Sequence, residues 1–171
     1  MSKLVPPLGG KGLVCALLTG AELEAEKKKA AGLKKVQISS RSERDLIMMG
    51  IGAFSPLDGF MTKADWKSVC ETMTLTDGCF WPLPITMDIS REDAAGMKPG
   101  DEIALYREKD LIATMKVADV YEMTADAKKW ECENVFKGNG PDSQKFWEVA
   151  EADHPGVQMV MAQKTSTLAA R

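Results

Sequence analysis

A phosphate site is the first chemistry to consider, because the residues Gly-Gly-Lys-Gly at 9–12 place a lysine among glycines. Glycine backbones approach a phosphate closely, and a lysine neutralises its charge. The run lacks the Gly-x-x-x-x-Gly-Lys-Ser/Thr spacing of a P-loop, however, and no strong strand precedes it. We therefore interpret residues 1–12, which also contain Pro6 and Pro7, as an irregular arm.

Acid–base and metal chemistry depend on histidines and carboxylates, and neither kind of residue is well placed. His154 is the only histidine, so one chain cannot assemble a two-histidine metal site, and its position before Pro155 is typical of a turn residue. No spacing marks out a carboxylate pair among the 25 acids, where the groups considered are Asp88, Glu92 and Asp93, and Glu131 and Glu133. Exposed acids are usually solvated surface groups. We expect no catalytic, cofactor-binding or metal-binding residue in this chain.

Glycines, a proline and large apolar residues are dense at positions 50–61. The Gly-x-Gly at the start of this run invites comparison with a dinucleotide-binding fingerprint. That fingerprint needs a preceding strand and a third glycine, whereas here a helix is predicted before the run and Ser55 takes the place of the glycine. We interpret the glycines as positions whose backbone angles are closed to other residues. The large apolar side chains of the run are expected in the core: Phe54, Leu57 and Phe60.

The composition is that of one globular domain. The 171 residues contain 44% hydrophobic and 27% charged side chains, as folded proteins do, and unlike disordered ones. The formal net charge is −3. Because clustered Lys and Arg supply most of the affinity for phosphate backbones, an acidic chain is a poor nucleic-acid binder. We expect neither DNA nor RNA as a partner.

Four cysteines lie far apart, at positions 15, 70, 79 and 132, without a Cys-x-x-Cys pair. This pattern predicts neither a zinc ribbon nor a thioredoxin-like redox motif. The apolar residues 13–18 are too few for a signal sequence or a membrane span. We therefore expect a reduced, cytoplasmic protein with no membrane partner, whose cysteines are mostly small core residues.

The first half of the chain is predicted to be mostly helical. Acids at the start, lysines near the end and a following glycine indicate a surface helix over 22–31, after which a short strand is expected at 35–38. Ser40 begins a capping box for a second helix that ends near residue 49. Thr62 caps a third helix, whose apolar residues are spaced i, i+3, i+4 and i+7. That apolar face comprises Trp66, Val69, Cys70 and Met73.

The second half is rich in predicted strands. A turn is expected near Lys109, and Thr124 and Asp142 are expected to cap two further helices. Strand-like alternation or apolar runs occur at 85–89, 101–106, 111–123 and 158–163, and residues 164–171 show no periodicity. Strands and short helices on this irregular schedule predict a mixed, strand-centred α+β domain and not a repeating βαβ array.

Three motifs, in this order, resemble the ATP sulfurylase family, the sulfate adenylyltransferases. They are the run at 50–61, Trp-Pro-Leu-Pro-Ile-Thr at 81–86 and Asp-His-Pro-Gly-Val at 153–157. The resemblance covers nearly all of residues 1–163. It implies the PUA-like N-terminal domain of that family, a strand-centred pseudobarrel with several short peripheral helices, and it leaves 164–171 as a tail or as the start of a linker to a catalytic domain.

The chemistry of that family, as the resemblance implies, belongs to residues that this chain lacks. The family joins ATP, supplied as Mg-ATP, and sulfate to give adenosine 5′-phosphosulfate and pyrophosphate. It uses a Gln-x-Arg-Asn-Pro stretch followed by a His-x-x-His pair, and neither occurs in the 171 residues. We expect this chain alone to be inactive, and we expect the reading frame to continue after Arg171 into both motifs.

The first hypothesis is therefore a non-catalytic scaffold domain. It would pack against the catalytic domain of the parent enzyme and take part in self-association into a homo-oligomer. The contact with the catalytic domain is expected at two places in the chain: Phe54, Ser55 and Pro56, and His154, Pro155 and Gly156. The alternative hypothesis is a free-standing PUA-like module that binds RNA or a protein. A stop codon directly after Arg171 would favour the module, and a continuing frame would favour the enzyme.

Overall fold

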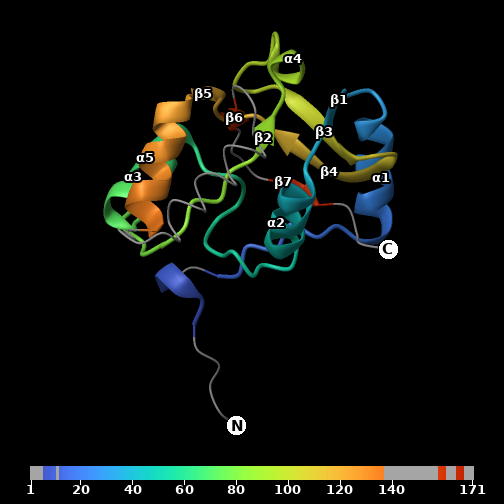
Figure 1. Ribbon diagram of the computed structural model, residues 1–171. Helices are drawn as coiled ribbons and strands as arrows, with labels where there is room; N and C mark the ends of the chain where they lie inside the picture. Colours follow the sequence, from blue (N-terminus) through green and yellow to red (C-terminus); the bar gives the residue numbers. More distant parts are fainter. Residues whose placement is uncertain (1–5, 11, 137–157, 161–164, 168–171) are drawn as a thin grey trace.

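Two small β-sheets with helices around them form the computed structural model, which describes residues 6–10, 12–136, 158–160 and 165–167 (Figure 1). The strands of the larger sheet lie in the order β1 (Lys34–Gln37), β3 (Glu102–Arg107), β4 (Asp110–Lys116) and β7 (Thr165–Thr167). β1 runs parallel to β3, whereas β4 is antiparallel to both β3 and β7. The mixed α+β arrangement agrees with the sequence-based prediction.

The β3–β4 hairpin turns at Glu108 and Lys109, as the sequence predicted. Glu108 has a φ of 57°, a left-handed conformation that is uncommon outside glycine. Gln37 of β1 secures this turn: its side-chain nitrogen donates to the carbonyl oxygen of Glu108, and its side-chain oxygen accepts from the amide of Glu108, both at 3.0 Å. The hairpin is thereby joined to the parallel edge strand.

The smaller sheet has the order β2 (Asp88–Ile89), β6 (Gln158–Val160) and β5 (Tyr121–Met123), with antiparallel pairing throughout. The sequence predicted one strand over 111–123, which is wrong. β4 ends at Lys116 in the larger sheet, and β5 belongs to the smaller one. The apolar run continues between them because Val117 is buried in the core and not because the ladder continues.

The longer helices are α1 (Gly20–Ala30), α2 (Ser40–Gly50), α3 (Lys63–Thr72) and α5 (Ala125–Phe136). All of them except α1 begin at a side chain that accepts a hydrogen bond from the first turn. The predicted caps Thr62 and Thr124 are confirmed, since their hydroxyl oxygens accept from the amides of Asp65 and Ala127 at 3.2 and 3.1 Å. For α2 the prediction is off by one residue. Ser39 is the cap, and its Oγ accepts from the amide of Ser42 at 3.1 Å.

Two shorter helices, η1 (Leu8–Gly10) and α4 (Arg91–Ala94), were not predicted. The predicted face of α3 is confirmed for Trp66, Val69 and Cys70, which are buried, whereas Met73 is the left-handed residue that ends the helix. The sequence shows no periodicity at 164–171, yet β7 lies there. The domain boundary that we expect after residue 163 stays a prediction, and the helix expected after Asp142 falls outside the described residues.

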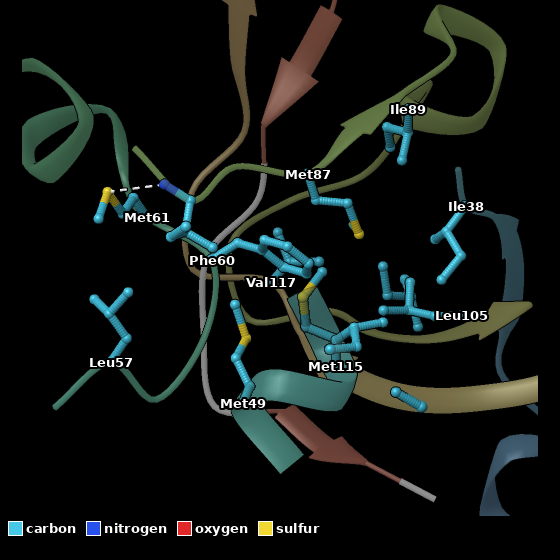
Figure 2. Packing of buried hydrophobic residues seen from close by; sticks show 14 of the residues in the cluster. Ile38, Met49, Leu57, Phe60, Met61, Met87, Ile89, Leu105, Met115 and Val117 are labelled. Carbon is cyan, nitrogen blue, oxygen red and sulfur yellow. Dashed lines mark hydrogen bonds between the residues drawn. The ribbon is translucent and has the colours of Figure 1, made fainter. Parts of the chain in front are cut away.

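The main core lies between the larger sheet, α2 and the loops that follow α2 (Figure 2). Phe60, 2% exposed, lies among Met49 of α2, Met115 of β4 and Val117. A second cluster joins α3 to α5, which lie side by side away from α1 (Figure 1). The apolar faces of the helices and strands therefore pack into two clusters within the described residues.

Candidate functional site

An N-terminal arm, residues 6–10 and 12–19, crosses the glycine-rich run at 50–61. The amide of Ala16 donates to the carbonyl oxygen of Gly50, the last residue of α2, at 3.2 Å. In Figure 1 the arm, drawn in blue, passes below α2 on its way to α1. The arm is therefore seated on the body of the domain at Ala16, which lies beyond residues 1–12, the stretch that the sequence predicted to be irregular.

Ser55 ties the arm to the glycine-rich run through one hydroxyl. Its Oγ accepts a hydrogen bond from the amide of Val14 at 2.9 Å and donates one to the carbonyl oxygen of Gly52 at 2.6 Å. The side chain is buried, so a lost partner would leave a polar atom without water. Ser55 thus has a structural role at the position where a dinucleotide fingerprint would have glycine.

Two glycines let the arm approach the run closely. Gly52 has a φ of +78°, and a Cβ placed on it would stand 2.8 Å from Sγ of Cys15. Gly9 has a φ of +77°, and a Cβ there would stand 3.2 Å from Sγ of Cys79 and 3.7 Å from Cγ of Pro56. At Gly52 any other residue would clash as well as strain the backbone. This geometry agrees with the interpretation that these glycines have a structural role.

The first two sequence motifs pack against each other. The ring of Phe54 meets the indole of Trp81 edge to face, with centroids 6.0 Å apart. The amide of Met61 donates to the carbonyl oxygen of Ile85 at 2.9 Å, and the amide of Ile85 reaches Sδ of Met61 at 3.4 Å (Figure 2). Residues 50–61 and 81–86 are therefore used for packing within the domain, and Phe54 is partly buried rather than a full core residue.

An apolar surface lies where the arm meets the end of α2, and we call it the arm–α2 surface. Its members are large hydrophobic side chains that remain exposed: Leu13, Leu17, Ile47, Met48 and Ile51. Leu13 is 65% exposed and Ile51 is 57% exposed. Ile51 follows Ile47 and Met48 by four and three residues, so the three lie together at the end of the helix. Contiguous exposed apolar side chains mark interaction sites.

Sequence reasoning missed this surface, although a signal was present. The residues Ile-Met-Met at 47–49, with Ile51 after them, place apolar side chains at the end of α2 outside its buried face. Three more exposed apolar side chains lie elsewhere in the arm and after α3: Leu8, Phe80 and Leu83. Leu8 adjoins Gly9, which lies beside Cys79, so the arm also borders this second group.

The residues predicted to contact a catalytic domain are only partly described. Phe54 and Ser55 make the contacts given above inside the domain, and Pro56 is half-buried near Gly9. A contact of these three with another domain stays a prediction. His154, Pro155 and Gly156 lie outside the described residues.

Two of the carboxylates considered from the sequence, Asp88 and Asp93, have side-chain partners in the structure. Asp88 forms an ion pair with Arg41 at 2.5 Å. Asp93 accepts a hydrogen bond from the hydroxyl of Ser90, the cap of α4, at 2.8 Å. Glu92 and Glu133 are on helices α4 and α5. Across residues 6–10, 12–136, 158–160 and 165–167, no three side chains of metal-ligating type come together.

Glu131 is buried between α3 and α5. Its Oε2 accepts from Nε1 of Trp66 at 2.6 Å, and its Oε1 lies 3.5 Å from Nζ of Lys128. Lys128 and Glu131 are each 8% exposed. The same cluster contains Tyr121, whose hydroxyl is buried without a hydrogen-bond partner in the described part of the chain. Burial raises the pKa of Tyr121, so its hydroxyl stays protonated.

The cysteines differ in environment. Cys70 and Cys132 are buried, Cys79 is half-buried and Cys15 is exposed. Burial raises the pKa of the Cys70 thiol to about 12, which keeps it protonated and unreactive. Burial also raises the pKa of Cys132.

Among the described helices, none combines the length and the apolar character needed to cross a bilayer.

Comparison with known proteins identifies relatives over the whole chain. The PUA-like domain family matches residues 5–171. A sulfate adenylyltransferase of Desulfovibrio desulfuricans is 68% identical over 169 residues, which are 99% of this chain and 40% of that protein. One of Desulfatibacillum aliphaticivorans is 63% identical over 99% of this chain and 41% of its own length. The chain thus spans about two fifths of the curated relatives that it matches.

A solved structure agrees with this fold. The hexameric APS kinase from Thiobacillus denitrificans matches with a TM-score of 0.69 and 26% identity, over 96% of this chain and 27% of that one. The resemblance that the sequence motifs indicated is confirmed by these relatives, and so is the predicted fold class. The chain belongs to the PUA-like domain family, and its sequence corresponds to a part of the sulfate adenylyltransferases.

Proposed function

We propose that this chain is the non-catalytic PUA-like domain of a sulfate adenylyltransferase, in which it acts as a scaffold and packs against the catalytic domain. The observation that carries this proposal is the 68% identity over 99% of the chain, combined with a match to only 40% of the relative. More than half of such an enzyme lies outside the matched part, which leaves room for a catalytic domain.

The chemistry is assigned to that other domain. Adenylyl transfer from Mg-ATP to sulfate depends on positioning the two substrates and on stabilising the charge that develops between them. The Gln-x-Arg-Asn-Pro and His-x-x-His elements that the family uses do not occur here. The described residues instead use the two matching motifs for packing, through Phe54 with Trp81 and Met61 with Ile85.

Pyrophosphate release from Mg-ATP and sulfate tests this proposal. The purified 171-residue chain should give no signal above a buffer blank, whereas the full-length polypeptide from the natural gene should form adenosine 5′-phosphosulfate. Turnover that stays with the 171-residue chain through several purification steps would contradict the assignment. A stop codon directly after Arg171, with no catalytic half encoded nearby, would also contradict it.

A binding assay addresses the alternative of a free-standing module. The net charge of −3 supplies no field to attract a phosphate backbone, so short RNA should bind weakly and without specificity. Fluorescence anisotropy at physiological salt measures this. Sub-micromolar affinity would favour the module. A homo-oligomer and a cytoplasmic location remain part of the proposal, and sedimentation and cell fractionation of the full-length protein test them.

A further inference from the structure

We infer that the arm–α2 surface is the face on which the rest of the sulfate adenylyltransferase polypeptide docks. This inference rests on the function proposed above and adds the location of the contact. It differs from the expected contact at Phe54, Ser55 and Pro56, because the structure uses Phe54 and Ser55 inside the domain.

The end of α2 carries the first part of the argument. Leu46 and Met49 face the core and are almost fully buried, while Ile47, Met48 and Ile51 are exposed at the same end of the helix. The first half of α2 is polar, so the exposed apolar side chains are confined to the end of the helix. Exposed apolar side chains that gather in one place mark interaction sites.

The arm carries the second part. The bonds from Ala16 to Gly50 and from Val14 to Ser55 hold it beside the helix, so that Leu13 and Leu17 extend the apolar surface of α2. Gly52, with its close approach to Cys15, permits this seating. A surface that is already held in place costs less ordering when a partner binds.

The size of the surface indicates which partner covers it. A stable complex between free proteins uses roughly 20–30 residues on each side. The five large apolar members of the arm–α2 surface account for only a part of such an interface. A partner on the same polypeptide is present at an effective concentration of roughly millimolar, so a smaller contact suffices. Because the relatives continue for more than half of their length beyond the match, the occupant is the remainder of that polypeptide.

The exposed thiol of Cys15 is a natural reporter, since it lies in the arm between Leu13 and Leu17. Its rate of maleimide labelling, followed by peptide mass spectrometry, is compared in the 171-residue chain and in the full-length protein. We expect at least a tenfold slower rate in the full-length protein. A matched control is Lys67→Cys on α3, whose side chain is exposed and is not a member of the arm–α2 surface, and which should label equally fast in both.

A second variant separates docking from local effects. Ile51→Lys should leave the melting temperature of the 171-residue chain unchanged, because the side chain is exposed, and should restore fast labelling of Cys15 in the full-length protein. Equal labelling of Cys15 in both proteins would overturn the inference, as would protection in the 171-residue chain that grows with its concentration, which would indicate a second copy. Adenosine 5′-phosphosulfate synthesis is measured on the same full-length sample. If the full-length sample is active and its Cys15 is labelled rapidly, only the docking face is refuted. If the full-length sample is inactive, the proposed function is refuted.

Discussion

The sulfur of Cys15 lies 2.8 Å from the point where a Cβ would stand on Gly52. Real Cβ atoms do not come so close to a neighbouring heavy atom, so this approach is open only to glycine. The contact joins the N-terminal arm to the glycine-rich run, and it explains a glycine that the sequence alone could relate to a cofactor fingerprint. The arm and the loop are parts of one packed unit.

The replacement Gly52→Ala should destabilise the domain by about 2–4 kcal/mol. Its positive φ costs a residue with a side chain about 1–2 kcal/mol, and overpacking against Cys15 adds about 1–2 kcal/mol. Urea unfolding of the 171-residue chain measures the loss. Gly78→Ala is the matched control, since Gly78 has a φ of +85° and nothing within 4 Å of its added Cβ. Similar losses of unfolding free energy for the two variants would show that the arm moves away from the added methyl group at no cost in stability.

Phe60→Ala should cost about 3–5 kcal/mol, the usual range for a fully buried ring. Phe54→Ala should cost about 1–3 kcal/mol, because its ring is only partly buried and loses chiefly its edge-to-face contact with Trp81. Equilibrium unfolding in urea gives both values. A larger loss for Phe54 than for Phe60 would contradict the packing described for the glycine-rich run.

The short-range features of the fold could be predicted from the sequence. The caps at Thr62 and Thr124 and the β3–β4 turn depend on residues within a few positions of one another, so their side-chain types indicate the structure. The parallel pairing of β1 with β3 joins segments about 70 residues apart, and β7 pairs with β4 over about 50 residues. No local pattern encodes such partners.

The arm–α2 surface also combines a feature that is encoded locally with one that depends on distant residues. The exposed side of α2 has a local signal in its consecutive apolar residues, whereas Leu13 and Leu17 join it only because Ser55 and Gly50 hold the arm. The buried Glu131 was weighed as one surface acid among many. Its burial depends on Trp66, which lies 65 residues earlier in the chain.

Glu131→Leu should destabilise the domain by about 3–5 kcal/mol, because it leaves the buried ammonium of Lys128 without its counter-charge and removes the acceptor of the Trp66 indole. The double variant Lys128→Leu with Glu131→Leu should recover most of this loss, since two apolar side chains replace the pair. Urea unfolding followed by tryptophan fluorescence measures both. If the double variant is no more stable than the single one, the ion pair is not the source of the effect.

Asp45 on α2 should make the domain less stable as the pH rises. Burial raises the pKa of Asp45 to about 6, Arg41 acts to lower that pKa and Asp88 acts to raise it. The unfolded chain should have the ordinary value of about 3.9. Between these two values the folded state holds more protons than the unfolded state, so the free energy of unfolding decreases as pH rises from about 4 to about 6 and is level above that.

Asp45→Asn removes this titration. The variant should be more stable than the parent by about 1 kcal/mol at pH 7.5, a value kept small because solvent screens a half-buried carboxyl, and the difference should vanish near pH 4. Urea unfolding of both proteins at several pH values gives the difference directly, and the other carboxylates cancel in it. A difference that does not change between pH 4 and pH 7.5 would show that Asp45 titrates as it does in the unfolded chain, and that α2 does not bury its carboxyl.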